Sequence, residues 1–167
     1  MAAIEMTISL DDAALSRALD RAIQAGTNLR QPMGEIAAEW MTLVHARFES
    51  ESDPLGVPWV KRRDDSGTHQ LLQLSRQLHN AIVPDFGPDF AQVGVLNTAG
   101  PAKYARIHNE GGTIVPKHKK ALRFGGRIVS QVVMPKRQYL GFGPKEQEAV
   151  TEVMGNFLRG VLSGADA

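Results

Sequence analysis

The residues best suited to chemistry lie in one short stretch, YARIHNEGG, at positions 104 to 112. Tyr104 and His108 are four residues apart, so a helical turn would place them on one face. Glu110 follows closely, and a Tyr–His pair beside a carboxylate can perform acid–base chemistry. Gly111 is a residue type that ends helices in the left-handed conformation. The stretch is therefore a proton-transfer site, an interface, or the end of a short helix, and we favour a structural role for His108.

The rest of the sequence gives a catalytic interpretation no support. It contains no Walker-type glycine loop, no recognisable nucleophile motif and no second carboxylate pair. Its five histidines do not form HxxxH or HExxH, and none stands at ligand spacing from an acidic pair. The absence of cysteine excludes disulfides, thiolate zinc sites, iron–sulfur clusters and a cysteine nucleophile. We therefore expect no enzymatic activity, no bound metal and no cofactor.

Charge is divided unevenly along the chain, although the net charge is only +1. Residues 1–60 carry nine acidic and four basic residues, whereas residues 101–140 carry nine basic residues and Glu110 alone as an acid. Such asymmetry predicts a basic face that binds a polyanion or an acidic partner. A solvated basic surface without a partner is the alternative.

Two basic segments, KRR at 61–63 and KHKK at 117–120, have the composition of phosphate-contacting sites. The sequence has no recognisable helix-turn-helix or zinc finger, and its 6% aromatic residues are too few for a series of base-stacking platforms. Any contact with DNA is therefore expected to involve the backbone alone and to weaken steeply with salt.

Apolar spacing predicts the elements that would position these residues. Intervals of three and four predict helices over residues 15–26, 33–48, 71–82 and 144–161. Pro84 would end the third of these helices, and Pro144 is well placed to begin the last one. Trp40 lies on the apolar stripe of the second helix, so we expect it in the core.

Strands are predicted where the period changes to two or where β-branched residues gather. Residues 4–8 alternate in this way, and β-branched residues are frequent in segments 91–97, 121–124 and 127–134, the last two joined by Gly125-Gly126. The order of elements predicts an α+β fold. We expect an antiparallel sheet or meander with a long basic hairpin, packed by about four α-helices, in a single domain spanning residues 1–167.

A long loop is expected between the second and third helices, over residues 52–70. Asp53, Pro54, Gly56 and Pro58 are turn residues, and Trp59 follows them directly. Trp59 either pins this loop to the domain, which we favour, or serves as an exposed anchor for a neighbouring subunit.

The composition is that of a soluble globular protein, with 43% hydrophobic and 22% charged residues. No apolar run approaches the roughly 20 residues of a membrane span, and the N-terminus has neither a basic leader nor a signal-like apolar stretch. We expect a protein that is made and used in the cytoplasm, without a membrane partner.

Five segments in one order resemble a known family. They are RFESESDPLGVPW (47–59), LLQLSRQLHNAI (71–82), VGVLN (93–97), YARIHNEGG (104–112) and MPKRQYLGFG (134–143). In this order they resemble the phage virion morphogenesis family, the tail-completion proteins of Mu-like and related contractile-tailed phages and prophages. The last segment departs from the family pattern at Lys136 and Gln138, and matches it at Pro135, Arg137, Leu140 and Gly141.

The resemblance implies a structural virion protein, assembled in the host cytoplasm, that completes the tail and helps join it to the head. It implies a homo-oligomeric ring that contacts head-connector and other tail proteins, with possible non-specific DNA contact. The alternative is a small protein that binds the nucleic-acid backbone. The residues expected to make interactions are Asp53, Trp59, Tyr104, His108, Lys117, Lys119, Lys120 and Arg137.

Overall fold

The computed structural model describes residues 12–62, 69–97, 100–116, 120–124 and 126–164. The strand predicted over residues 4–8 lies outside these residues, as do Lys117 and Lys119. The elements in chain order are α1 (Asp12–Gly26), α2 (Arg30–Ser50), α3 (Gln77–Asn80), β1 (Ile82–Phe86), β2 (Ala91–Val95), α4 (Ala102–Glu110), β3 (Gly112–Ile114), β4 (Leu122–Phe124), β5 (Arg127–Val129), β6 (Val132–Met134) and α5 (Pro144–Ser163).

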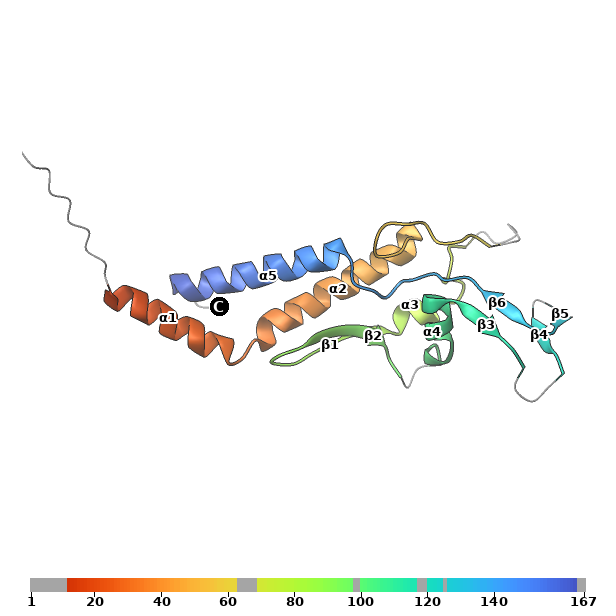
Figure 1. The fold of residues 1–167 in the computed structure, drawn as a ribbon, viewed down its shortest axis with the longest axis horizontal. Coiled ribbons are helices and arrows are strands. Elements are labelled where there is room, and N and C mark those ends of the chain that lie inside the picture. Colours follow the sequence, from red (N-terminus) through yellow and green to blue (C-terminus); the bar gives the residue numbers. More distant parts are fainter. Residues whose placement is uncertain (1–11, 63–68, 98–99, 117–119, 125, 165–167) are drawn as a thin grey trace, which may run out of the picture.

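The α+β class is confirmed, with helices and antiparallel strands in one elongated molecule (Figure 1). The strands do not form one sheet, however. They make three separate pairs, β1–β2, β3–β6 and β4–β5. The strands of the last two pairs have only three residues each, and Ser130 and Gln131 separate β5 from β6. Together these two pairs form the long hairpin that Gly125-Gly126 predicted (Figure 1).

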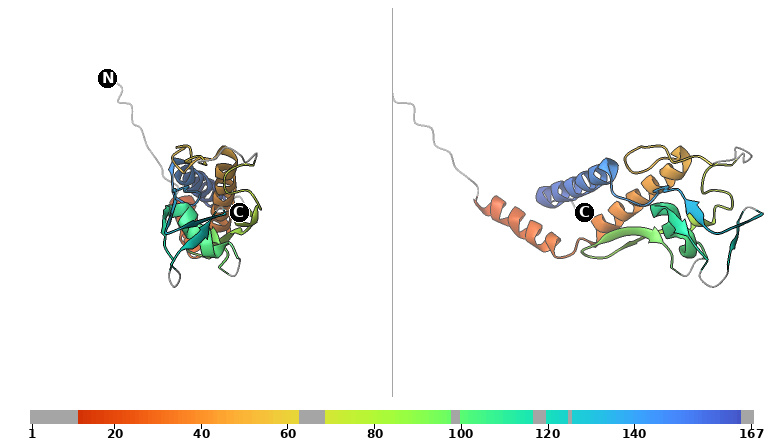
Figure 2. Two further views of the ribbon diagram at one scale, coloured as in Figure 1. Left: turned by 90° about the vertical axis from the view of Figure 1, so that its right-hand side faces the viewer. Right: turned by 45° about the vertical axis from the view of Figure 1, so that its right-hand side comes forward.

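Helix α2 lies at the centre of the fold, between α5 and the β1–β2 hairpin (Figures 1 and 2). Its predicted apolar stripe is confirmed: Ile36, Ala37, Val44 and Phe48 are all buried. Phe48 belongs to the main core cluster, which includes Val44, Phe48, Trp59, Leu71, Leu78, Ile82, Ala105 and Tyr139. The core thus joins residues from both halves of the chain.

A buried ion pair also fastens α2 to α5. Arg47 and Glu146 are 6% and 3% exposed, and their side chains contact each other directly. The Arg47 guanidinium also donates to the carbonyl oxygens of Tyr139 and Gly141, at 2.9 and 3.2 Å. The second Glu146 oxygen accepts the Gly143 N–H at 2.8 Å, which caps the first turn of α5.

Trp40 does not lie in the core, contrary to the prediction. Its side chain is only partly buried, at the edge where α2 meets the start of α5. The indole Nε1 donates to the Glu146 carbonyl oxygen at 3.2 Å, and the ring packs edge-on against Phe142. Because Phe142 is itself 61% exposed, this aromatic pair remains near the surface.

Helix α1 matches its predicted limit at Gly26 and extends from one end of the molecule (Figure 1). Arg21 connects it to the last turn of α5, donating to the carbonyl oxygens of Val161 and Leu162. The apolar stripe of α1 remains largely in solvent. Leu15, Leu19 and Ile23 are 50%, 52% and 70% exposed.

The predicted helix over residues 71–82 is wrong in length. Only α3 forms there, and Pro84 lies inside β1 rather than at a helix end. Leu72 and Arg76 adopt positive φ angles of 60° and 53°, which interrupt a right-handed helix. The segment is tied to the end of α2 instead, because the Gln73 side chain donates to the Phe48 carbonyl oxygen at 2.8 Å. This tertiary contact overrides the local helical pattern.

Candidate interaction site

Helix α4 carries the aromatic part of the site. Tyr104 and His108 share one face of it, as predicted, and their rings meet edge to face with centroids 5.7 Å apart. The helix is followed by Gly111, whose φ of 73° is positive as predicted, but its ψ of −177° is extended, so the predicted left-handed conformation is wrong. A Cβ at this position would lie 2.8 Å from the backbone nitrogen of Lys136, so glycine also allows a close approach of the chain.

Glu110 does not join Tyr104 and His108. Its carboxylate accepts from Arg106 at 2.8 Å in an exposed ion pair, and it lines a separate hollow of about 290 Å³ with Asn109. The three groups of the acid–base interpretation therefore belong to two different surfaces. Within the described residues, no group of three or more His, Asp or Glu side chains is arranged to hold a metal ion.

Arg137 is brought to α4 by backbone pairing. Its N–H donates to the His108 carbonyl oxygen at 2.9 Å, and the Asn109 side chain accepts the N–H groups of Tyr139 and Leu140. The Tyr139 hydroxyl then donates to the Ala105 carbonyl oxygen inside the core. These bonds hold residues 137–140 alongside α4. The side chains of Arg137 and His108 therefore lie next to each other.

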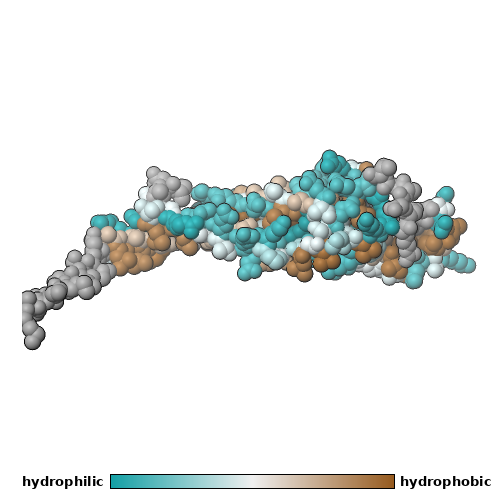
Figure 3. All heavy atoms as spheres, turned by 90° about the horizontal axis from the view of Figure 1, so that it is seen from above, coloured by the Kyte–Doolittle hydropathy of each residue, from teal (hydrophilic) through white to brown (hydrophobic). Residues whose placement is uncertain are grey.

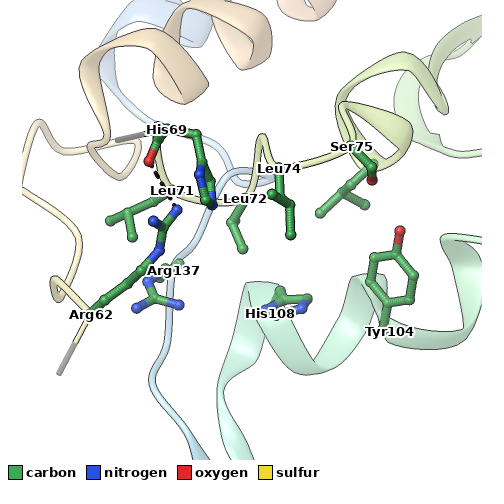
Figure 4. Close-up of a pocket in the computed structure, with 10 residues that line it drawn as sticks. Arg62, His69, Leu71, Leu72, Leu74, Ser75, Tyr104, His108 and Arg137 are labelled. Atoms are coloured by element: carbon green, nitrogen blue, oxygen red, sulfur yellow. Dashed lines mark hydrogen bonds between the residues drawn. The ribbon is translucent and has the colours of Figure 1, made fainter. Parts of the chain in front are cut away.

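A hollow of about 440 Å³ lies where these residues meet the 69–78 segment (Figure 4). One wall is cationic and aromatic, and the other is apolar. The lining residues are Arg62, His69, Leu71, Leu72, Leu74, Ser75, Leu78, Tyr104, His108 and Arg137. Three of the eight predicted interaction residues, Tyr104, His108 and Arg137, are thus brought together.

The electrostatics of the hollow disfavour positive charge. Burial lowers the pKa of Arg137, the nearby Arg62 lowers it further, and Glu51 opposes the shift. Burial also lowers the pKa of His108, and Arg137 adds to the effect. The Nδ1 atom of His108 is buried and has no hydrogen-bond partner among the described residues. The site therefore holds two arginines that make no ion pair among the described residues, and Glu51 offsets their charge only in part.

Asp53 and Trp59 shape the neighbouring loop. The Asp53 carboxylate accepts the N–H groups of Leu55 and Val57 at 2.8 and 2.9 Å, which closes a tight turn. Trp59 is 5% exposed, packs edge-on against Phe48 and donates from its indole to the Gln138 carbonyl oxygen. The interpretation that Trp59 pins the loop is confirmed. No contact tests the partner-binding role predicted for these two residues.

Lys120 lies away from the hollow, at the base of the β4–β5 hairpin, with an exposed side chain. Arg123 and Arg127 on the same hairpin are also exposed. This is the basic hairpin that the charge distribution predicted, and it forms a second candidate surface.

Sequence reasoning did not connect Arg62, Leu72 and Leu74 with the site. Arg62 was assigned to a phosphate-binding segment, and the leucines were assigned to a helix. The sequence holds no signal that separates the leucines, yet in the structure Leu74 is 77% exposed whereas Leu71 and Leu78 are buried. A regular helix does not separate the leucines in this way when all lie on one stripe.

The fold and the site define a small α+β protein with a buried core, exposed charged surfaces and a cationic hollow. A family model described as the phage virion morphogenesis family matches residues 10–159. The chain belongs to that family, and its role is in phage virion morphogenesis. Neither the curated proteins nor the solved structures gave a match. No helix in the described residues is long and apolar enough to cross a membrane.

Proposed function

We propose that this protein completes the phage tail and helps join it to the head as the repeating, non-enzymatic subunit of a closed ring. The observation that carries the proposal is the separation of opposite charges onto different parts of an elongated subunit. Unlike patches that bind each other make a head-to-tail contact, and repetition of that contact closes a ring when the rotation permits.

The acidic patch is a groove between α2 and α5. Its volume is about 430 Å³, and Glu35, Glu39, Glu148 and Glu152 line it with Lys145. These four carboxylates outnumber the single lysine and are exposed to solvent. The acidic groove therefore attracts a cationic partner surface.

The basic patch is the β4–β5 hairpin with Lys120, Arg123 and Arg127. Their exposed side chains make no ion pair with any carboxylate of the described residues. In Figure 1 this hairpin lies at one end of the molecule, away from the paired helices α2 and α5 that hold the groove. Because the two patches of one subunit are far apart, each binds the opposite patch of a second copy, which favours assembly.

Exposed apolar side chains at both ends support the same proposal. Figure 3 shows hydrophobic surface over α1 and again at the hairpin end. On α1, Leu15 and Ile23 are 50% and 70% exposed, and on β5 and β6, Ile128 and Val133 are 80% and 60% exposed. Apolar patches of this kind commonly mark contacts with other proteins.

A charge-swap experiment tests the ring. The hairpin variant is Lys120→Glu, Arg123→Glu and Arg127→Glu, and the groove variant is Glu35→Lys, Glu39→Lys and Glu148→Lys. We expect each variant to lose assembly in sedimentation velocity, and the chain that carries all six changes to recover it, because the attraction is restored with its sign inverted. Unchanged mass in both single-patch variants would contradict the proposal.

The second candidate function is contact with the DNA backbone, favoured by the same unpaired cations on the hairpin. Here Lys117, Lys119 and Lys120 are reversed to Glu, and virions are assembled with the variant. If the hairpin faces DNA, rings form but particles lose DNA; if it faces a neighbour, assembly itself fails. Binding of the isolated protein to DNA should also fall steeply with salt if the backbone is its target.

A further inference from the structure

Arg137 is a buried cation that makes no ion pair among the described residues, and the charge of Glu51 only partly offsets the repulsion from Arg62. Its side chain is 8% exposed, and its Nε donates to the Val60 carbonyl oxygen at 2.9 Å. In the described chain the ion pairs are Arg47–Glu146 and Arg106–Glu110. The two terminal nitrogens of Arg137 therefore face the hollow without a carboxylate (Figure 4).

Two further groups on the same wall also lack a partner: Arg62 has no acidic partner, and one ring nitrogen of His108 has no hydrogen bond among the described residues. Arg62 lies near Arg137 in Figure 4 and donates to the backbone carbonyl oxygens of His69 and Gln70, not to an acid. The Nδ1 atom of His108 is buried and accepts or donates no hydrogen bond within the part of the chain that the structure describes. Burying unpaired polar and cationic groups together is unfavourable, and an anion that enters the hollow would offset this cost.

The opposite wall shows what kind of anion fits. Leu74 is 77% exposed, Leu72 is partly buried, and Leu71 and Leu78 form the buried side below them. A bare phosphate would leave these leucines in water, and a nucleic-acid backbone would bring ribose and phosphate against them. A ligand that carries both a carboxylate and an apolar side chain matches both walls.

We propose that the hollow binds a peptide segment in which Asp or Glu stands next to a large apolar residue. The carboxylate bridges Arg62 and Arg137, and the apolar side chain packs on Leu72 and Leu74. Charge-assisted hydrogen bonds from a guanidinium to a carboxylate are among the stronger polar contacts in proteins. The proposal rests on the proposed function in one respect, that the partner is a protein of the assembling virion.

The probe is the blocked dipeptide Ac-Asp-Phe-NH2, which copies the exposed Asp89–Phe90 pair of the β1–β2 turn. Its control is Ac-Asn-Phe-NH2, which has the same shape and no charge. The full chain, labelled with ¹⁵N, is titrated with each, and the Arg137 Nε–H and the His108 ring are followed by NMR. We expect saturable chemical-shift changes at both groups with Ac-Asp-Phe-NH2 and none with Ac-Asn-Phe-NH2.

Four variants locate the contacts. Arg62→Gln and Arg137→Gln should each weaken the acidic dipeptide about tenfold or more, because each removes a charge-assisted hydrogen bond. Leu74→Ser should weaken it about threefold or more, because it removes the isopropyl group against which the apolar side chain packs. Arg123→Gln on β4 is the matched control and should change nothing. If Arg137→Gln fails to fold, Arg62→Gln at the rim still gives the result.

Inorganic phosphate is the competing probe. Tighter binding of phosphate than of the acidic dipeptide, unaffected by Leu74→Ser, would replace the peptide proposal with a phosphate site. Equal binding of the two dipeptides, or no saturable shift with any probe, would overturn it. These outcomes are separate from the charge-swap result, because a ring can form through the groove and hairpin whether or not the hollow binds a peptide.

Discussion

Two arginines of similar burial have opposite surroundings in this molecule. Arg47 is 6% exposed and binds Glu146 and two carbonyl oxygens, whereas Arg137 is 8% exposed and binds one carbonyl oxygen beside another arginine. Burial lowers the pKa of both, but Glu146 opposes the shift at Arg47 and Arg62 reinforces it at Arg137. Burial alone thus does not assign a role: a satisfied arginine holds the fold, and an unsatisfied one is available to a partner.

The largest expected effect comes from breaking the satisfied pair. Glu146→Ala leaves Arg47 buried without its counter-ion and removes the cap of α5, so we expect a loss of about 3–5 kcal/mol in the free energy of unfolding. Urea denaturation measures it. The double change Arg47→Met with Glu146→Leu should recover most of the loss, because it removes both charges together.

The matched control is the exposed pair of α4. Glu110→Ala removes the partner of Arg106, but both side chains lie largely in water. Its unfolding free energy should therefore remain close to that of the unchanged chain. A loss at Glu146 no larger than at Glu110 would contradict the view that the buried pair fastens α2 to α5.

The next effect concerns the backbone that places Arg137. Gly111→Ala combines a positive φ of 73° with a Cβ at 2.8 Å from the Lys136 nitrogen, so we expect a cost of about 2–3 kcal/mol. Gly126→Ala is its control, since φ is 77° and no atom lies within 4 Å, and about 1 kcal/mol is expected. Thermal or urea unfolding compares the two, and equal losses would show that the contact with Lys136 is unimportant.

A smaller effect is expected from Arg137 itself. Arg137→Gln loses the bond to Val60 but also removes repulsion from Arg62, so stability should change by no more than about 1 kcal/mol. The same urea experiment measures it. A loss as large as that of Glu146→Ala would mean that Arg137 already has a strong partner, and the comparison between the two arginines would fail.

The parts of the fold that sequence could predict are those determined by local pattern. Helix α2 follows directly from residues such as Ile36, Val44 and Phe48 at helical spacing, and Pro144 marks the start of α5. The helix predicted over residues 71–82 is wrong because Gln73 bonds to the end of α2 and Leu72 adopts a positive φ, and no local pattern contains either feature.

The candidate site was predictable in part. Tyr104 and His108 share a face because they are four apart, so spacing sufficed for them. Arg137 was predicted from the family resemblance, but no sequence pattern places it beside Arg62, because the two are far apart in the sequence and only the fold brings them together. The Arg47–Glu146 pair spans 99 positions and had no sequence signal for the same reason.

The smallest expected effect tests whether the charge of Arg137 lowers the pKa of His108. The pKa of His108 lies below its ordinary value of 6.5, so the folded chain holds the neutral ring while the unfolded chain takes up a proton. Stability should therefore fall as the pH drops through about 6.5, and His108→Gln should remove part of that fall while leaving the contribution of His45, whose pKa is also lowered. In Arg137→Gln the pKa of His108, followed through its ring signals by NMR, should move upward because one of its two causes is gone. An unchanged pKa would mean that burial alone acts on His108 and that the charge of Arg137 has no effect on the ring.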